Sequence, residues 1–493
     1  MARVILAIDQ GTSGSKAVLF SPRGKIIAKA TATLSSTYPA AGYVEQDPEE
    51  IYTTVLQATR DAVVAYESQG GRREDIACCG ISNQRETFLL WKADGRPLRP
   101  AVVWQCKRSV PVCERLQKEG VASELKERTG LMTDPYFSGT KLTWIIENEP
   151  ETAAAIRRGE VLFGTVDTWL LYRLTGGTAY ASDYTNASRT LFMNLDTLEW
   201  DSRMLQMLSA DGIRLPELHS SSASFGESNF QGVFEHPIPI SAMIGDSHAA
   251  AFGEGCMSPG AAKATLGTGS SILMNTGNQR PVSEHGMVET ICWSAGKRVD
   301  YALEGIIVSC GSTITWLRDQ MGLFSESHES DTLAESVPDN GGVCLVPAFA
   351  GLAAPYWKME QTALISGLTF ATGKAHVVRA GLESIGYQVK DVVDAMELDS
   401  GIALAHLQAD GGLTKSSFVM PHLADLLQVP VAAIELTEAS ALGAALLAGL
   451  GAGIYSGIEE IAAMPYTSID HQPRTQTGVQ EEYQMWKKTV RAL

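Results

Sequence analysis

Short apolar runs separated by turn residues open the chain. Residues 3–9, 16–20 and 25–32 are rich in apolar side chains, and each run has the length of a single strand. The segment between the first two runs, QGTSGS, consists of small and polar residues, and the next break, SPRG, favours a type I turn. The pattern therefore predicts three consecutive strands. A hairpin with a tip rich in Gly, Thr and Ser joins the first two, and such tips can hold phosphates.

A helical pattern follows the third run. Asp47 is a suitable N-cap residue, Pro48 takes the first helical position, and apolar residues recur at helical spacing from Ile51 to Ala62. Strand-like and helix-like segments continue to alternate, which is typical of layered α/β proteins. The Gly- and Ala-rich run 439–457 is predicted to be a buried, closely packed helix rather than a membrane span.

The hairpin pattern occurs a second time near the middle of the chain. Residues 262–277 give a strand, a tip with the sequence GTGSS and a second strand, and residues 406–418 give a strand, a double-glycine turn and a helix start. A motif repeated half-way along the chain indicates a duplicated domain. We place the boundary after residue 253, which gives an N-terminal domain of residues 1–253 and a C-terminal domain of residues 254–493.

Charge and cysteine content restrict the class of partner. The formal net charge of −17 on 493 residues argues against nucleic acid and against an anionic membrane surface. The eight cysteines are scattered without a CxxC pair, which fits neither a disulfide framework nor a zinc site. The apolar stretch at the N-terminus is too short for a signal peptide. We expect a soluble cytoplasmic protein without membrane insertion, which binds anions only at local sites.

Acidic residues after strand-like runs indicate a divalent cation. Asp9 ends the first strand beside the glycine tip, and a carboxylate next to a phosphate loop implies Mg²⁺ between them. Lys16 is expected to reach such a phosphate. An ordinary polar hairpin is the alternative, against which the second tip at 267–271 and the third loop at 410–416 argue. In GDSH, residues 245–248, an acid, a hydroxyl and an imidazole follow an apolar run, which raises the question of whether they act together.

Polar residues also interrupt core-like sequence at 80–91. Arg85 and Glu86 offer donors and an acceptor suited to the hydroxyls of a polyol, and a surface salt bridge is the alternative. Trp104 follows a short apolar run and offers a flat wall for a carbon chain. Tyr136 precedes a predicted helix with its hydroxyl available. Core packing is the alternative for both aromatic residues.

Several longer segments resemble the FGGY family of carbohydrate kinases and, within it, the glycerol kinase subfamily. YFSGTKLTWIIEN at 136–148 and ALISGLTFATGKAHVVRAGLE at 363–383 are similar to the two family signatures. FGTVDTWLLYRLTGG, DYTNASRTLF, YALEG and VPAFAGLAAPYW occur in the same order as in that subfamily, and the resemblance covers almost the whole chain. It implies an α/β fold of two actin-like (ribonuclease-H-like) domains, with ATP and substrate in the cleft between them.

The resemblance also implies roles for individual residues. The positions that match nucleotide-binding residues are Thr12, Ser13, Gly14, Lys16, Gly267, Thr268, Gly311, Thr315, Gly412 and Ser416. The positions that match the substrate pocket are Arg85, Glu86, Trp104, Tyr136, Asp246, Ser247 and Ser271. Asp9 and Asp246 match the acids near Mg²⁺, and Asp246 also matches the catalytic base.

Five of these positions depart from the usual pattern of the subfamily. Lys16 stands where arginine is usual, and Thr315 and Ser416 stand where amides are usual, which a nucleotide site is expected to tolerate. Ser247 replaces a glutamine, and Ser271 replaces a bulky aromatic residue. Because a long amide and a large ring are lost, these two changes predict a wider and more polar substrate pocket.

These features lead to three hypotheses of function. The first is transfer of a phosphoryl group from ATP, with Mg²⁺, to a primary hydroxyl of a small polyol, so that glycerol would give glycerol 3-phosphate. Asp246 would be the general base in this reaction, and His248 would have a structural role. The second is a kinase of a four- or five-carbon polyol or ketose, such as erythritol, threitol, erythrulose, xylitol or xylulose. The third is a non-catalytic ATP-driven switch, against which the polyol-pocket residues argue. We further expect a homodimer or homotetramer.

Overall fold

The structure, a computed structural model, describes residues 3–465, 467–474 and 478–493. Its strands are β1 (Val4–Gly11), β2 (Gly14–Phe20), β3 (Ile26–Thr33), β4 (Glu45–Gln46), β5 (Ile76–Asn83), β6 (Phe88–Lys92), β7 (Ala101–Val102), β8 (Val161–Thr165), β9 (Ala181–Asp183), β10 (Met193–Asn194), β11 (Glu199–Trp200), β12 (Glu217–His219), β13 (Ser222–Ser228), β14 (Ile238–Gly245), β15 (Ala261–Leu266), β16 (Ser270–Gly277), β17 (Val288–Ala295), β18 (Arg298–Ile307), β19 (Cys344–Val346), β20 (Leu364–Ser366), β21 (His406–Asp410), β22 (Val431–Ile434) and β23 (Ser468–His471). Its helices are α1 (Pro48–Ser68), α2 (Val110–Lys118), α3 (Ala122–Thr129), α4 (Ser138–Asn148), α5 (Pro150–Arg157), α6 (Val166–Leu174), α7 (Tyr184–Ala187), α8 (Ser202–Met207), α9 (Asp246–Gly253), α10 (Gly311–Asp319), α11 (Glu329–Glu335), α12 (Lys374–Ser400), α13 (Val419–Leu427), α14 (Ala439–Gly451), α15 (Ile458–Ala462) and α16 (Val479–Ala492).

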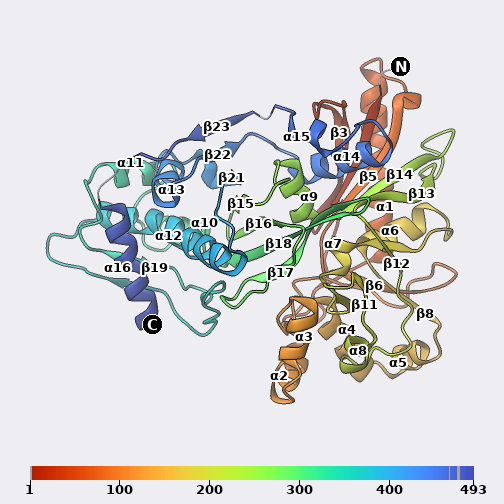
Figure 1. Cartoon of the computed structure of the whole chain (residues 1–493), viewed down its shortest axis with the longest axis horizontal. Coiled ribbons are helices and arrows are strands. Elements are labelled where there is room, and N and C mark those ends of the chain that lie inside the picture. Colours follow the sequence, from red (N-terminus) through yellow and green to blue (C-terminus); the bar gives the residue numbers. More distant parts are fainter. Residues whose placement is uncertain (1–2, 466, 475–477) are drawn as a thin grey trace.

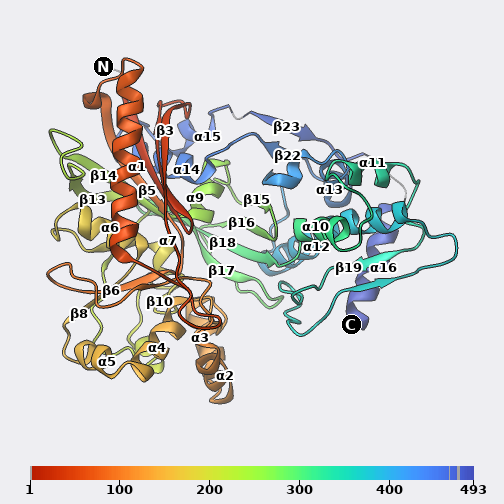
Figure 2. The same ribbon diagram turned by 180° about the vertical axis from the view of Figure 1, so that it is seen from behind.

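A mixed sheet of 13 strands runs through both lobes of the molecule (Figure 1). Its order is β23-β22-β21-β15-β16-β18-β17-β13-β14-β5-β1-β2-β3. The lobes join where β13 meets β17, through the single pair of Ser222 with Ala295. Seen from behind, α1 lies over the first lobe, whereas α10 and α12 belong to the second (Figure 2).

The two lobes share one strand order. In the first lobe β3, β2, β1, β5 and β14 lie side by side, and in the second β18, β16, β15, β21 and β22 do so in the corresponding order. In the first lobe β1 pairs antiparallel with β2 and parallel with β5. In the second lobe β15 pairs in the same way, antiparallel with β16 and parallel with β21. This duplicated topology confirms the predicted α/β class with two actin-like domains.

The hairpin tips of both lobes require glycine at the same place. A Cβ on Gly14, at the start of β2, would lie 2.6 Å from the carbonyl oxygen of Ala32 on β3. A Cβ on Gly269, just before β16, would lie 2.6 Å from the carbonyl oxygen of Ile307 on β18. A side chain at either position would therefore push two paired strands apart and open the tip. The repeat predicted from the sequence is thus also a structural repeat.

Helix α14 comes from the second half of the chain but covers the sheet of the first lobe. It packs against α9 and against strands β1, β5 and β14, and it is buried over most of its length. A Cβ on Gly443 would lie 1.8 Å from the carbonyl oxygen of Ala249, so the backbones of α14 and α9 are in direct contact. The prediction of a buried, closely packed helix is confirmed for residues 439–451, whereas residues 452–457 of the predicted run lie in turns beyond its end. Within the described ranges, the structure has no helix long and apolar enough to span a bilayer.

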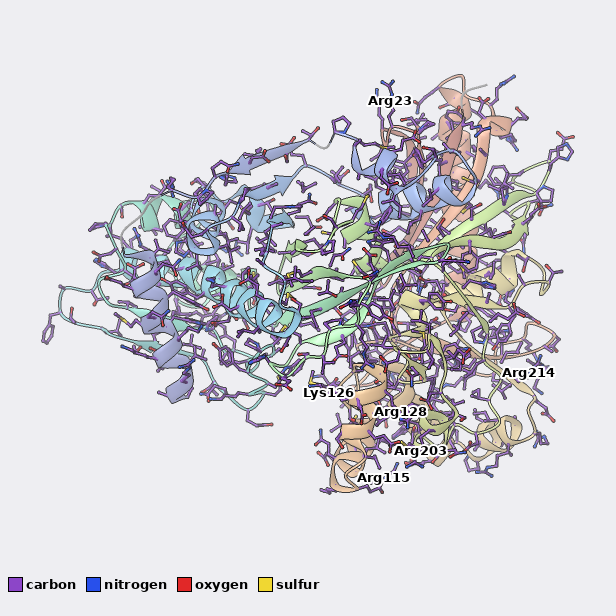
Figure 3. The ribbon with its side chains drawn as sticks, in the orientation of Figure 1. Arg23, Arg115, Lys126, Arg128, Arg203 and Arg214 are labelled. Atoms are coloured by element: carbon purple, nitrogen blue, oxygen red, sulfur yellow. The ribbon has the colours of Figure 1, made fainter. Side chains whose placement is uncertain are left out.

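Basic side chains gather at the end of the first lobe that carries α2, α3 and α8 (Figure 3). They are Arg115, Lys126, Arg128 and Arg203. Arg115 contacts Glu147 at 2.6 Å, and Lys126 donates to the carbonyl oxygen of Ser283 at 2.8 Å. Arg128 contacts Asp201 at 3.1 Å, and Arg203 contacts Glu124 at 3.2 Å. The three arginines of this cluster are therefore each paired with a carboxylate of the chain, whereas the Lys126 ammonium is bound by a neutral carbonyl oxygen.

Candidate active site

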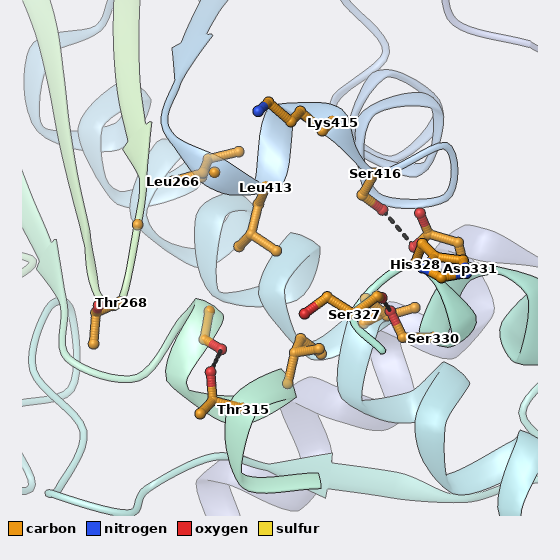
Figure 4. Close-up of a pocket in the computed structure, with 15 residues that line it drawn as sticks. Leu266, Thr268, Thr315, Ser327, His328, Ser330, Asp331, Leu413, Lys415 and Ser416 are labelled. Carbon is orange, nitrogen blue, oxygen red and sulfur yellow. Dashed lines mark hydrogen bonds between the residues drawn. The ribbon is translucent and has the colours of Figure 1, made fainter. Parts of the chain in front are cut away.

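A cavity of about 520 Å³ lies in the second lobe, against the tip between β15 and β16 (Figure 4). Six lining residues are those that the family resemblance assigns to the nucleotide. They are Gly267, Thr268, Gly311, Thr315, Gly412 and Ser416. The Gly311 amide, at the start of α10, donates to the carbonyl oxygen of Gly267 at 2.9 Å, which fixes the helix against the tip. The structure thus brings together three loops that are far apart in the chain.

One wall of this cavity was not foreseen from the sequence. Asp331, on α11, accepts hydrogen bonds from the Ser416 hydroxyl at 2.7 Å and from the Ser417 amide at 3.0 Å. His328 and Lys415 line the same cavity. The segment around α11 carries no local motif, and it reaches the cavity because α11 packs against α12. The sequence therefore held no signal for this wall.

The tip at residues 12–14, which we expect to hold phosphate and call the first phosphate tip, lies between β1 and β2. Lys16, which we expect to reach a phosphate there, is 39% exposed, and its ammonium contacts Glu438 at 2.8 Å. Lys29 contacts the other oxygen of the Glu438 carboxylate at 3.0 Å. Lys16 is thus already paired with a carboxylate from the second half of the chain, which lies at the N-terminal end of α14.

Asp9 and Asp246 lie near the carboxyl ends of β1 and β14, two strands of the first lobe that are separated by β5. Asp9 is on β1, Asp246 follows β14 directly, and Ser82 of the intervening β5 donates its hydroxyl to Asp9 at 3.2 Å. Burial, together with the nearby Asp246 carboxylate, raises the pKa of Asp9 to about 6. Two mutually repelling carboxylates suit Mg²⁺, which takes one or two carboxylates together with phosphate oxygens and waters. In the described part of the chain no group of three or more His, Cys, Asp or Glu side chains could hold a metal ion, so substrate oxygens and waters would complete the coordination.

The three polar residues of GDSH have separate environments. The Asp246 carboxylate, 39% exposed at the start of α9, accepts a hydrogen bond from the Ser247 amide at 2.7 Å and lies 3.4 Å from Arg85 Nε. The Ser247 side chain is half-buried. His248 is fully buried, and its Nε2 lies 3.3 Å from the Thr290 hydroxyl. Burial, with a contribution from Arg85, lowers the pKa of His248 well below its ordinary value. The imidazole is therefore neutral and lies in the core, apart from the exposed Asp246.

Four charged side chains form a buried network next to Asp246. Arg85 donates to both oxygens of Glu304, at 2.9 and 3.2 Å. Arg189 donates to Glu86 at 2.6 Å and lies 2.9 Å from Glu304. Although burial opposes the charge, Arg189 and Arg85 hold the pKa of Glu304 well below its usual range. Because all four side chains are buried, the alternative of a surface salt bridge at residues 85 and 86 is wrong.

Two members of this network, Arg189 and Glu304, were missed as site residues. They lie within DYTNASRTLF and YALEG, two segments that carry the family resemblance, and this was the signal that could have found them. Glu86 has a φ of +60°, a conformation that is uncommon for residues other than glycine. Such strained backbone often occurs at functional sites.

Trp104 and Tyr136 form an aromatic wall, with ring centroids 5.6 Å apart and planes at 69°. Lys141, fully buried in α4, donates to the carbonyl oxygens of Trp104 and Tyr136 at 3.3 and 2.7 Å. Burial lowers the pKa of this lysine to about 8. From the second lobe, Ser271 donates its hydroxyl to Glu304 at 3.1 Å. Residues of both lobes that the sequence assigns to the substrate pocket thus meet at one charged network.

Comparison with known proteins places these features in a family. The model of the N-terminal domain of the FGGY family of carbohydrate kinases matches residues 4–253, and that of the C-terminal domain matches residues 262–452. A glycerol kinase of Stenotrophomonas maltophilia is 45% identical and glycerol kinase 2 of Thermotoga maritima 44%, each over 99% of this chain and 98% of its own length. The crystal structure of Plasmodium falciparum glycerol kinase with ADP matches with a TM-score of 0.93 at 32% identity, over 100% of this chain and 98% of that one.

Proposed function

The chain belongs to the FGGY family of carbohydrate kinases, and we propose that it transfers the γ-phosphoryl group of ATP to a primary hydroxyl of glycerol, giving glycerol 3-phosphate. The observation that carries this proposal is the position of Asp246. Its carboxylate stands at the head of α9 beside Arg85, close to Asp9 at the strand end that leads into the first phosphate tip. A base, a hydroxyl-binding guanidinium and a phosphate-binding tip at one place are what phosphorylation of an alcohol requires.

Asp246 acts as the general base in this proposal. Its Oδ1 is engaged by the Ser247 amide and lies near Arg85, whereas Oδ2 has no hydrogen-bond partner among the residues that the structure describes. Oδ2 is therefore the atom that takes the proton of the acceptor hydroxyl. The acceptor oxygen forms its bond to the γ-phosphorus while the bond from that phosphorus to the oxygen bridging the β-phosphate breaks, and ADP leaves. Arg85 keeps the carboxylate in one orientation while its own position is fixed by Glu304.

The acceptor is held by the charged network and the aromatic wall. Each Nη atom of Arg85 donates one N–H to Glu304 and retains a second for an acceptor hydroxyl. Glu86 accepts a hydroxyl proton in a hydrogen bond, and Trp104 and Tyr136 pack against the carbon chain.

The nucleotide occupies the cavity of the second lobe, with its phosphates between the tips at residues 12–14 and 267–269. Lys16 assists at the phosphates. Asp9 and Asp246 would hold Mg²⁺, which supplies neutralisation of phosphate charge when bound.

A four- or five-carbon polyol or ketose is the second candidate acceptor. The Ser271 hydroxyl donates a hydrogen bond to Glu304 at 3.1 Å, and the half-buried Ser247, with its hydroxyl, follows Asp246 in the chain. These groups give the pocket hydrogen-bonding capacity that an additional hydroxyl of the acceptor would use. The non-catalytic switch finds no support, since the chain belongs to a family of kinases.

We also propose the organisation of the chain in the cell. The family models end at residue 253 and resume at residue 262, which supports domains of residues 1–253 and 254–493. The eight cysteines are free and buried, which supports a reducing, cytoplasmic environment. A homodimer or homotetramer remains our prediction for the assembly, to be tested by light scattering.

An acceptor screen tests the proposed function. ATP consumption is measured with glycerol, erythritol, threitol, erythrulose, xylitol and ketopentoses, and the phosphorylated product is identified by mass. We expect glycerol to give the highest kcat/KM. A four- or five-carbon acceptor with a higher kcat/KM would establish the second candidate, and no stimulation by any acceptor would overturn the proposal.

A further inference from the structure

Gln84 is the centre of a buried hydrogen-bond network, and its side chain is 1% exposed. Its Nε2 donates to Gln10 Oε1 at 3.1 Å and to Gln46 Oε1 at 3.0 Å. Its Oε1 accepts from the hydroxyls of Thr12 at 3.4 Å and Thr87 at 3.0 Å. These are all four hydrogen bonds that a side-chain amide can make, so the orientation of Gln84 is fixed.

The network joins the first phosphate tip to the aromatic wall. The indole N–H of Trp104 donates to the Thr12 hydroxyl at 2.9 Å, across 92 positions of sequence. The backbone amide of Trp104 donates to the Thr87 hydroxyl at 3.1 Å. Gln46 donates to the carbonyl oxygen of Thr12 at 2.7 Å. Trp104 is therefore held at its amide and at its ring, and Thr12 at its hydroxyl and at its carbonyl.

We propose that Gln84 and Thr87 are positioning residues that set the phosphate tip against the aromatic wall, so that the phosphoryl group and the acceptor hydroxyl meet in line. This inference rests on the proposed kinase activity. A buried polar network whose members are all satisfied is rigid. A displacement of about 1 Å between reacting groups can lower the rate by about 10²-fold. Thr87 is fully buried and both of its hydroxyl contacts lie within the network, so it acts through its neighbours.

Thr87→Val tests the proposal because valine has the shape of threonine without the hydroxyl. It leaves the Trp104 amide without its acceptor and removes one donor from Gln84. We expect kcat to fall about 10-fold or more, with the KM for ATP changed less than about threefold, because positioning affects the transition state more than binding. Thr87→Ser keeps the oxygen, and we expect it to retain about half or more of the wild-type kcat.

Thr59→Val is the matched control. Thr59 is also fully buried in the first lobe, and its hydroxyl donates to the carbonyl oxygen of Val55 at 2.8 Å, outside the network. This variant loses a buried hydroxyl of the same kind, and we expect its kcat to stay at the wild-type value. An equal fall of kcat in Thr59→Val and Thr87→Val would show a general loss of stability and overturn the inference. A wild-type kcat in Thr87→Val would overturn it as well.

Gln84→Glu keeps the inference testable if Thr87→Val does not fold. The ionised carboxylate accepts hydrogen bonds but cannot donate to Gln10 and Gln46, whereas its protonated form can donate one. We expect kcat relative to wild type to recover as the pH is lowered. A ratio that is independent of pH would overturn the role of Gln84.

A binding measurement separates failure of this inference from failure of the proposed function. If no acceptor stimulates ATP consumption by the wild-type protein, the proposed function fails. The link between tip and wall is then measured by fluorescence on addition of ADP with Mg²⁺. The Trp104 contribution is the difference between wild type and Trp104→Phe. We expect it to respond to ADP in the wild type and to respond less in Thr87→Val, whereas an unchanged response would overturn the inference.

Discussion

Arg85 and Glu304 join the two lobes through a buried ion pair with two hydrogen bonds. Arg85 follows β5 of the first lobe, Glu304 is on β18 of the second, and the side chains are 6% and 0% exposed. Without Glu304, the two buried arginines would retain only Glu86 and the partly exposed Asp246 as acidic partners, and breaking a buried ion pair costs about 3–5 kcal/mol. We therefore expect Glu304→Gln to lower the free energy of unfolding by about that amount, as measured by urea denaturation.

The control for this prediction is an exposed ion pair. Glu160 contacts Arg158 at 2.6 Å with both side chains in solvent, so Glu160→Gln is expected to leave the urea midpoint unchanged. If the urea midpoint of Glu304→Gln were unchanged as well, the ion pair between the lobes would not stabilise the fold as predicted.

Glu254, which directly follows α9, makes stability depend on pH. Burial raises its pKa to about 8, with Lys263 opposing this shift and Asp410 adding to it. In the described structure, neither oxygen of the Glu254 carboxylate accepts a hydrogen bond from a donor, and the Asp410 carboxylate is the group to which a protonated Glu254 can donate. The folded protein therefore retains a proton that the unfolded chain, with an ordinary pKa of 4.5, has already lost.

The sign of this effect follows from the bound protons. Between about pH 4.5 and 8 the native state binds one proton more than the unfolded state at this position, so stability falls as the pH rises. Glu254→Gln cannot ionise, and its melting temperature relative to wild type should increase from pH 5 to pH 8. A difference between the two proteins that stays constant over this range would contradict the assignment.

We expect Ser271 to set the size of the acceptor pocket. Ser271→Phe fills the space beside Glu304 and removes the hydroxyl that donates to it at 3.1 Å. We expect the ratio of kcat/KM for erythritol to that for glycerol to fall about 10-fold or more, since a steric or unpaired polar contact discriminates between acceptors. Ser271→Ala, which removes the hydroxyl without adding bulk, separates the two effects. If the ratio of the two kcat/KM values were unchanged in Ser271→Phe, the acceptor would not bind beside Ser271.

Local patterns predicted the elements that depend on neighbouring residues. The strands at the start of the chain form as expected, and α1 begins at Pro48 with the Asp47 side chain accepting the Glu49 amide at 2.9 Å. Both glycine-rich tips could be predicted because a hairpin tip is formed by consecutive residues. The six nucleotide positions of the second lobe came from the family resemblance, and the structure places them around one cavity.

The remaining site residues depend on contacts between distant parts of the chain. Glu304 meets Arg85 only when the two lobes come together, and Asp331 meets Ser416 only through the packing of α11. The bond between Thr12 and Trp104 likewise joins two segments that have no common motif. Such pairs leave no periodic or local pattern, so the sequence of a single chain could not predict them.

In the proposed reaction, Asp246 takes the proton of the acceptor hydroxyl. Asp246→Asn keeps the shape of the side chain and an oxygen that can accept from the Ser247 amide, but it removes the base. The decisive measurement is the single-turnover rate of phosphoryl transfer from ATP to the acceptor, with ADP binding measured by calorimetry on the same protein. We expect unchanged ADP binding and a transfer rate lowered by about 10²- to 10⁴-fold. A transfer rate near that of the wild type would contradict this role of Asp246.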